Sequence, residues 1–247
     1  MTRTPLPPPY ATVVFDCDST LSDIEGIEEL ATGRQDEIRE LTDRAMNGQL
    51  PLEAVYGARL EAIRPTAAQI AELGQRYYDH VAPHAIELVA ALQFLEKRVC
   101  VVSGGLLEPV RDLAIRLGIL ADDVEAVAVR HDAAGEYAGF DETSPLTRAG
   151  GKIDVVGRIA AANPPVVLIG DGATDLEAAV VCGRFVAYGG VERRANVFES
   201  ADVTCDVHDF AALIPLLLSG DEIDRLAAHP DHAPLVMAAR ELTSSGQ

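Results

Sequence analysis

The stretch Ala11-Thr12-Val13-Val14-Phe15-Asp16-Cys17-Asp18-Ser19-Thr20 carries the strongest structural signal in this sequence. Its apolar, β-branched half, residues 11–15, predicts a short buried strand. Asp16 and Asp18 then leave the carboxyl end of that strand, which is the edge where open α/β sheets place their ligands. Burying two unpartnered carboxylates costs free energy, so the pair needs a cation or a shared proton. On this stretch alone an alternative is equally good, namely a turn whose Asp, Ser and Thr side chains cap the next helix.

The length and the net charge of the chain limit the classes of protein to which it can belong. The chain has 247 residues, enough for one large domain or a domain with an insertion, and its formal net charge is −19. This acid excess argues against a nucleic-acid partner and against an anionic membrane partner. No run approaches the ~18 apolar residues of a membrane span, and the Pro-rich start lacks the apolar stretch of a signal peptide. The four cysteines are widely spaced without a metal-binding pattern, so we expect a cytoplasmic protein with reduced thiols.

Turn signals divide the chain into segments of different pattern. Residues 24–83 show four helical stretches separated by Gly, Asn and Pro, without a strand signal, which predicts an all-helical insertion. Later strands alternate with helices, which predicts a parallel sheet covered on both faces, and a turn at Gly135 predicts a hairpin that runs to Phe140. The expected strands cover residues 98–102, 124–130, 166–169 and 185–187. The expected units are a core (1–23 and 84–220), the helical insertion, and a tail (221–247) with a helix near 233–242.

Two further loops carry polar residues at predicted strand ends. Ser103-Gly104-Gly105 follows the second expected strand, and Gly170-Asp171-Gly172-Ala173-Thr174-Asp175 follows the strand at 166–169. Neighbouring parallel strands would bring these loops and the Asp16 loop to one edge of the sheet. Asp16, Asp18, Asp171 and Asp175 would then form a cluster of like charge. Such a cluster calls for a hard divalent cation, and Mg²⁺ prefers oxygen ligands of this kind.

An anion site is expected beside this metal. The backbone amides after Ser103, at an expected helix N-terminus, favour an anion, and Lys152, one of two lysines in the chain, adds a positive point charge. A metal, an anion cradle, a lysine and an aspartate nucleophile are together the components of phosphoryl transfer through an aspartyl-phosphate. For Lys152 alone, a surface lysine at a helix start remains the simpler interpretation.

In this combination and order, the motifs resemble those of the haloacid-dehalogenase-like phosphatases. The matching elements are Asp16-x-Asp18-Ser19-Thr20, Ser103, Lys152 and Gly170-Asp171-Gly172-x-x-Asp175. Within that family the chain is similar to the phosphoserine phosphatase branch, through the stretches Glu25-Gly26-Ile27-Glu28-Glu29-Leu30-Ala31, Arg44-Ala45-Met46 and Gly135-Glu136-Tyr137-Ala138-Gly139-Phe140-Asp141-Glu142-Thr143. The resemblance implies a Rossmann-like doubly wound parallel sheet with an inserted all-helical cap. It also implies Mg²⁺-dependent hydrolysis of O-phospho-L-serine to L-serine and phosphate, the last step of serine biosynthesis.

The resemblance implies a role for each matching residue. Asp16 would attack phosphorus, and Asp18 would protonate the leaving oxygen and then activate water. The phosphoryl group would be held by Ser103, Gly104, Gly105 and Lys152, with Thr174 beside them. The metal would be bound by Asp16, the Asp18 backbone carbonyl and Asp171, with Asp175 in support.

Substrate specificity is expected from the helical insertion. By resemblance, Arg59 would grip the substrate carboxylate with a bidentate fork, and Glu25 would meet the ammonium group. Met46 would line the pocket, and Arg194 is a further substrate-binding position. Taken singly, Arg59 fits a surface helix and Glu25 a first-turn acid equally well. Leu52 departs from the family pattern, which has a Phe there, and the smaller side chain would loosen specificity.

Leu52 keeps a second hypothesis open, a phosphotransferase or a phosphatase for another small phosphomonoester with the same chemistry. A non-catalytic binding protein is disfavoured because the acidic motifs and Lys152 are all present. A dehalogenase is disfavoured because halide departure does not require an acid such as Asp18. The tail matches no recognised segment and is assigned to packing or oligomerisation, with a homodimer as one candidate assembly.

Overall fold

The computed structural model describes residues 4–46, 49 and 52–245. Its centre is a six-stranded sheet of parallel strands in the order β3-β2-β1-β6-β7-β8. The strands are β1 (Thr12–Phe15), β2 (Arg98–Leu106), β3 (Val124–Val127), β6 (Val166–Gly170), β7 (Arg184–Tyr188) and β8 (Val203–Cys205). All four residues of β1 are fully buried, as expected for a strand covered on both faces. The predicted parallel α/β sheet is therefore confirmed.

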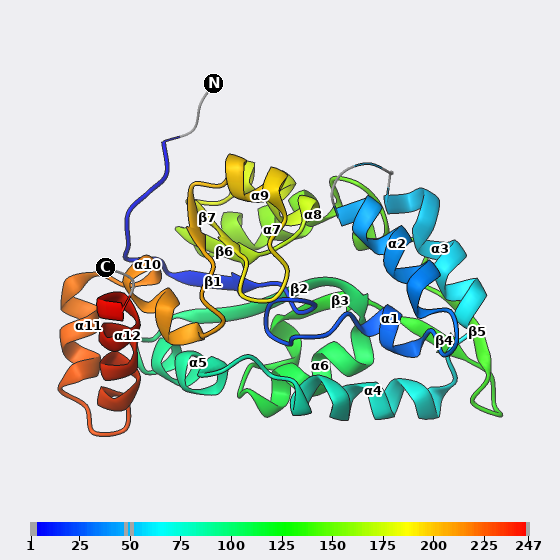
Figure 1. Cartoon of the computed structure of the whole chain (residues 1–247), viewed down its shortest axis with the longest axis horizontal. Helices are drawn as coiled ribbons and strands as arrows, with labels where there is room; N and C mark the ends of the chain where they lie inside the picture. The colour runs from blue at the N-terminus through cyan, green and yellow to red at the C-terminus, as the bar shows by residue number, and fades with distance from the viewer. Residues whose placement is uncertain (1–3, 47–48, 50–51, 246–247) are drawn as a thin grey trace.

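Helices cover both faces of this sheet (Figure 1). One face carries α5 (Ala85–Phe94) and α6 (Leu107–Arg116), and the other carries α7 (Gly151–Ala162), α8 (Ala173–Ala178) and α9 (Ala195–Ser200). The chain continues after β8 to α10 (Ile214–Leu217). The sequence did not predict α9 or β8, because each is too short to show a clear periodicity.

Four helices separate β1 from α5 along the chain, and they lie where the turn signals placed them. They are α1 (Gly26–Leu30), α2 (Gln35–Met46), α3 (Leu52–Ile63) and α4 (Ala67–Asp79). α4 begins with a capping box between Thr66 and Gln69 and then runs beside α6 (Figure 1). The two helices are so close that a Cβ atom on Gly74 would lie 2.8 Å from Asp112 Oδ2. α4 is therefore fixed to the core, whereas α1–α3 extend past the end of the sheet.

The strand expected at 124–130 is two strands in two different sheets. β3 pairs with β2 in the central sheet, whereas β4 (Val129–His131) pairs with β5 (Tyr137–Phe140) in an antiparallel hairpin. The alternating sequence pattern continues through Ala128, although the strand that pairs with this segment changes there. The pattern therefore cannot show where β3 ends and β4 begins. The hairpin contacts the junction of α3 and α4, where Arg64 Nη2 donates to Tyr137 O at 3.1 Å and the Ala67 amide donates to Gly135 O at 2.9 Å. It therefore lies with the helical segment.

The expected C-terminal tail is a pair of docked helices, α11 (Gly220–Ala227) and α12 (Ala233–Ser245). The sequence analysis missed α11, although Ser219 and Glu222 form a capping box at its start, which is a sequence signal for a helix N-terminus. Lys97 anchors α11 to the core, because its buried Nζ donates to Tyr10 O at 2.7 Å and forms an ion pair with Glu222. The helices lie at the opposite end of the molecule from α1–α3 (Figure 1). The segment therefore packs against the core.

The four cysteine side chains are buried, and no disulfide joins them within the described residues. In the same part of the chain, no helix is both long enough and apolar enough to span a bilayer.

Candidate active site

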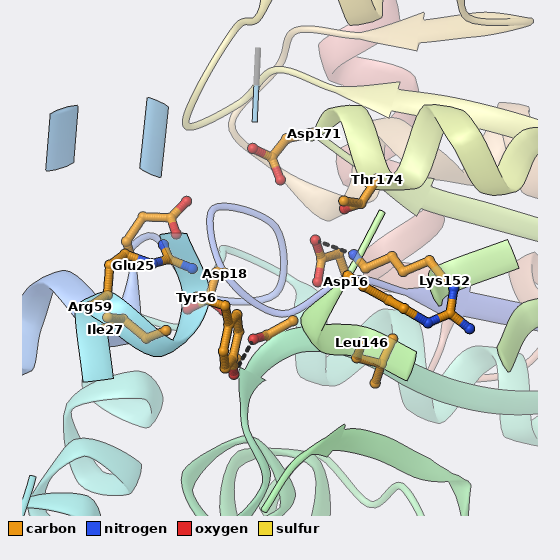
Figure 2. A pocket seen from close by; sticks show the side chains of 13 residues that line it. Asp16, Asp18, Glu25, Ile27, Tyr56, Arg59, Leu146, Lys152, Asp171 and Thr174 are labelled. Atoms are coloured by element: carbon orange, nitrogen blue, oxygen red, sulfur yellow. Dashed lines mark hydrogen bonds and ion pairs between the residues drawn. The ribbon is translucent and has the colours of Figure 1, made fainter. Parts of the chain in front are cut away.

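A pocket lies at the carboxyl edge of the sheet, between the ends of β1, β2 and β6 and the helices α1 and α3. Its empty volume is about 600 Å³, which includes space open to solvent. Figure 2 shows Glu25 and Arg59 on one side, Asp16 and Lys152 on the other, and Asp18 between them. The core lines it with Asp16, Asp18, Gly104, Gly105, Leu146, Arg148, Lys152, Asp171 and Thr174, and the helical segment with Glu25, Ile27, Tyr56 and Arg59.

Three aspartates converge at this edge. Asp16 follows β1, Asp171 follows β6 and Asp175 lies on α8, and each offers a carboxylate oxygen within 4.8 Å of the others. They meet because β1 and β6 are paired in register, with Phe15 beside Ile169. All three carboxylates are buried, so their mutual repulsion needs positive charge to offset it.

Lys152 supplies part of that positive charge. Its Nζ lies 2.7 Å from Asp16 Oδ2 and 2.6 Å from Asp175 Oδ1. Burial alone would lower the pKa of Lys152, but the two carboxylates raise it above its usual value, so the side chain stays charged. Burial raises the pKa of Asp175 to about 7, with the charge of Asp16 adding to the rise and Lys152 opposing it. The remaining negative charge and the all-oxygen donor set fit a hard divalent cation bound by Asp16, Asp171 and Asp175.

Arg194, the residue before α9, approaches the cluster from outside the pocket. Its guanidinium forms an ion pair with Asp171, and its Nη2 lies 3.7 Å from Glu25 Oε1. The side chain is buried but does not line the pocket. The resemblance implied a substrate contact for Arg194, which stays a prediction, and in the structure its guanidinium lies close to two carboxylates of the site.

The side chain of Asp18 makes a separate set of contacts. Its Oδ1 accepts hydrogen bonds from the Tyr77 hydroxyl at 2.5 Å and the Gly26 amide at 2.7 Å, and the Ser103 hydroxyl lies 3.3 Å from its Oδ2. Burial raises the pKa of Asp18, and the charge of Asp16 adds to the rise, although the three hydrogen bonds oppose it. A carboxyl group with a raised pKa is suited to general acid and base work.

The segment Ser103-Gly104-Gly105 lies within an irregular strand end. β2 extends to Leu106 and α6 begins at Leu107, so these residues end a strand and do not begin the helix as expected, and their role in binding an anion stays a prediction. The register between β2 and β3 shifts over this segment, and Gly104 and Gly105 reach the pocket wall. Ser103 does not line the pocket, and its hydroxyl accepts a hydrogen bond from the Gly105 amide at 2.9 Å.

Helix α3 supplies two residues of the pocket wall. The Tyr56 hydroxyl donates to Gly104 O at 2.9 Å, which ties α3 to β2. Arg59 is 3% exposed, and its Nη1 donates to Thr42 Oγ1 at 2.8 Å. Its Nε has no hydrogen-bond partner within the described residues. A buried guanidinium with a spare donor at a pocket wall is suited to bind a carboxylate.

Glu25 lies immediately before α1 and accepts a hydrogen bond from the Ser19 hydroxyl at 2.7 Å. Burial raises the pKa of Glu25 to about 8, with the charge of Asp18 adding to the rise and Arg194 opposing it. Met46 ends α2 and Leu52 begins α3, but the structure does not describe their side chains, so the roles expected of these side chains stay predictions.

Four lining residues were missed by the sequence analysis, namely Ile27, Tyr56, Leu146 and Arg148. Arg148 is of a residue type that binds anions, but none of the four stands in a motif or spacing that distinguishes it from other residues of its type. Ile27 and Tyr56 lie close in sequence to Glu25 and Arg59, and that proximity is the one signal that could have found them.

The chain is similar to known proteins over most of its length. The family model of haloacid dehalogenase-like hydrolases matches residues 13–179. Phosphoserine phosphatase from Bos taurus is 37% identical over 209 residues, which cover 83% of this chain and 92% of that protein. The Homo sapiens phosphoserine phosphatase is 39% identical over 193 residues, which cover 76% of this chain and 86% of that protein. A solved structure, a phosphoserine phosphohydrolase-like protein from Francisella tularensis, is 25% identical with a TM-score of 0.74, and the match covers 82% of this chain and 99% of that one. The chain therefore belongs to the haloacid dehalogenase-like hydrolase family, among the relatives named phosphoserine phosphatase.

Proposed function

We propose that this chain hydrolyses O-phospho-L-serine to L-serine and phosphate through an aspartyl-phosphate on Asp16, as the last step of serine biosynthesis. The observation that carries the proposal is a pocket with two chemically different ends (Figure 2). Asp16, Lys152 and Asp171 form an end suited to a phosphoryl group. Glu25 and Arg59 form an end suited to one ammonium and one carboxylate group. The relatives named phosphoserine phosphatase support the same substrate.

Asp16 and Asp18 divide the chemistry between them. The Asp16 carboxylate is held by the Cys17 amide at 2.7 Å and by Lys152, so it attacks phosphorus from a fixed orientation. Asp18 gives a proton to the seryl oxygen as the bond from phosphorus to that oxygen breaks. In the second half, Asp18 takes a proton from the water that attacks the acyl-phosphate, and the Asp16 carboxylate is restored. Lys152 offsets charge on the phosphoryl oxygens throughout.

We expect Mg²⁺ at the aspartate cluster. Asp16, Asp171 and the Asp18 backbone carbonyl would hold it, with Asp175 in support, and their hard oxygen donors suit this ion. When bound, Mg²⁺ neutralises negative charge on the phosphoryl group. The ion pair of Arg194 with Asp171 supports the demand for positive charge at this point.

The helical segment 24–83 is proposed as the cap that selects the substrate over a core formed by 1–23 and 84–220. Arg59 would bind the substrate carboxylate, and Glu25 would bind its ammonium group. The hairpin of β4 and β5 contacts the same helices, because the tilted rings of Tyr56 and Phe140 lie with their centroids 5.5 Å apart. We therefore include the hairpin with the cap as a second support for α3.

Phosphate release from phosphoserine, phosphothreonine and sugar phosphates, each with and without Mg²⁺, tests this function. We expect phosphoserine to be the preferred substrate and Mg²⁺ to be required. Asp16→Asn keeps the shape of the side chain and removes the nucleophile, so turnover should be abolished while the circular dichroism spectrum stays native. Undiminished phosphate release by Asp16→Asn would exclude the mechanism, and a preference for another phosphomonoester would exclude the substrate.

A further inference from the structure

The two oxygens of the Asp18 carboxylate have different hydrogen-bond neighbours. Oδ1 accepts two short hydrogen bonds, from the Tyr77 hydroxyl at 2.5 Å and from the Gly26 amide at 2.7 Å. Oδ2 lies 3.3 Å from the Ser103 hydroxyl, which is a weaker contact. Because Oδ1 already accepts from two donors, Oδ2 is the oxygen with capacity left to give or take a proton.

Two glycines fit closely around this arrangement. A Cβ atom on Gly26 would lie 2.0 Å from the Tyr77 hydroxyl oxygen, so a side chain at position 26 and the tyrosine hydroxyl cannot coexist without a shift. A Cβ atom on Gly105 would lie 2.6 Å from Asp18 Oδ2. The Asp18 carboxylate therefore lies in a slot that limits its rotation, and the Tyr77 hydroxyl forms one wall of it.

Tyr77 is held by the core, although it lies in the helical segment. Its side chain is fully buried, and its backbone carbonyl accepts a hydrogen bond from the Ser22 hydroxyl at 3.1 Å. Ser22 is itself on the loop that follows β1, a few residues from Asp18. α4, which carries Tyr77, runs against α6. The Tyr77 hydroxyl therefore has a fixed position relative to the loop that carries both catalytic aspartates.

We propose that Tyr77 is a positioning residue that holds Asp18 for proton transfer to the leaving alcohol, an inference that rests on the proposed function. By donating to Oδ1, Tyr77 fixes the carboxyl group and leaves Oδ2 as the oxygen that exchanges a proton with the substrate. As the bond from phosphorus to the alkoxy oxygen breaks, its electron pair takes the proton from Oδ2, and the alcohol departs neutral. In the second half, Oδ2 takes a proton from water as the new bond to phosphorus forms and the bond to Asp16 breaks.

The leaving group supplies the test. Tyr77→Phe removes one hydroxyl. Its loss should slow hydrolysis when the leaving group needs a proton, as an alkoxide does, and should have little effect on hydrolysis when the leaving group needs none, as with 4-nitrophenolate. We expect kcat/KM to fall at least about tenfold for phosphoserine and phosphoethanolamine, which is the effect of losing one charge-assisted hydrogen bond. For 4-nitrophenyl phosphate we expect kcat/KM to fall less than about threefold. The ratio of the two values in one preparation does not depend on the folded fraction, so partial unfolding cannot mimic the effect.

Tyr78→Phe is the matched control, because it removes a hydroxyl from the next residue of the same helix. It should leave the ratio of alkyl to aryl phosphate hydrolysis unchanged. An equal fall for alkyl and aryl substrates in Tyr77→Phe, or no fall for either, would overturn the positioning role. A wild-type protein that prefers another alkyl phosphate over phosphoserine would refute the proposed substrate, while the alkyl-to-aryl comparison would still decide the role of Tyr77.

Discussion

Replacing Arg59 by methionine should remove the preference for a phosphomonoester that carries a carboxylate. Arg59 is 3% exposed, one of its nitrogens donates to Thr42, and its Nε has no hydrogen-bond partner within the described residues. A carboxylate in the pocket would therefore meet a desolvated guanidinium with free donor capacity. Methionine keeps much of the side-chain volume and removes the charge and the donors.

The size of the effect follows from the hydrogen bonds that are lost. Two charge-assisted hydrogen bonds contribute about 3 kcal/mol at the lower end of their range. At about 1.4 kcal/mol for each tenfold change, kcat/KM for phosphoserine should fall about a hundredfold. Phosphoethanolamine lacks the carboxylate but keeps the phosphate and the ammonium group, so its kcat/KM should change less than about threefold.

Steady-state phosphate release from the two substrates is the assay, with Arg158→Met as the control. Arg158 lies on α7 with its side chain 59% exposed, so this control makes the same change of net charge away from the pocket. It should leave both substrates unaffected. If Arg59→Met lowered kcat/KM equally for phosphoserine and phosphoethanolamine, Arg59 would support the fold of the cap and not bind the carboxylate, and the reasoning would be refuted.

Two further predictions concern the metal and the C-terminal helices. Mg²⁺ at about 100 times its Kd should stabilise the protein by about 2.7 kcal/mol, which raises Tm by about 5–10 °C, and Asp171→Asn should remove most of that shift in a thermal melt. A full shift in Asp171→Asn would exclude this residue as a ligand. Burial alone would raise the pKa of Glu222, but its hydrogen bond and ion pair with Lys97 lower this pKa below its usual value. The pair therefore stabilises the folded protein when the pH is above the usual pKa of Glu, and this stabilisation is lost as the pH falls. The difference in Tm between the wild type and Lys97→Met should therefore shrink as the pH falls below about 4.5, the usual pKa of a Glu side chain, and a difference that does not change with pH would contradict the role of the pair.

Local pattern was sufficient to predict the catalytic edge. Three of the predicted strands ended next to polar residues, and parallel strands place such ends on one side of a sheet. Asp16, Lys152 and Asp171 are close together for this reason, and their distances follow from strand pairing and from the start of α7. The same local reasoning misplaced Ser103, because strand periodicity cannot show that β2 continues through an irregular end.

The cap side of the pocket was less predictable. The sequence offered Glu25 and Arg59 through a family resemblance, but it gave no signal for Tyr56, whose hydroxyl joins α3 to β2. Arg194 was expected to bind substrate, and it forms an ion pair with Asp171 in the structure. These contacts cross between helices and strands whose relative placement is set by packing of the whole molecule.

The sequence by itself determined a parallel α/β sheet, a helical insertion after the first strand, and an acidic edge built for phosphoryl chemistry. These features could be predicted because the periodicity of a strand or a helix is visible within a short stretch of sequence. The carboxyl ends of parallel strands also lie at the same edge of a sheet, so the residues that follow them are brought together. Only the tertiary structure decided that the Tyr77 hydroxyl meets Asp18, although the two residues are 59 positions apart. The periodicity of apolar residues shows which face of α4 is buried. The position of α4 against the core decides that the Tyr77 hydroxyl on this face reaches the Asp18 carboxylate.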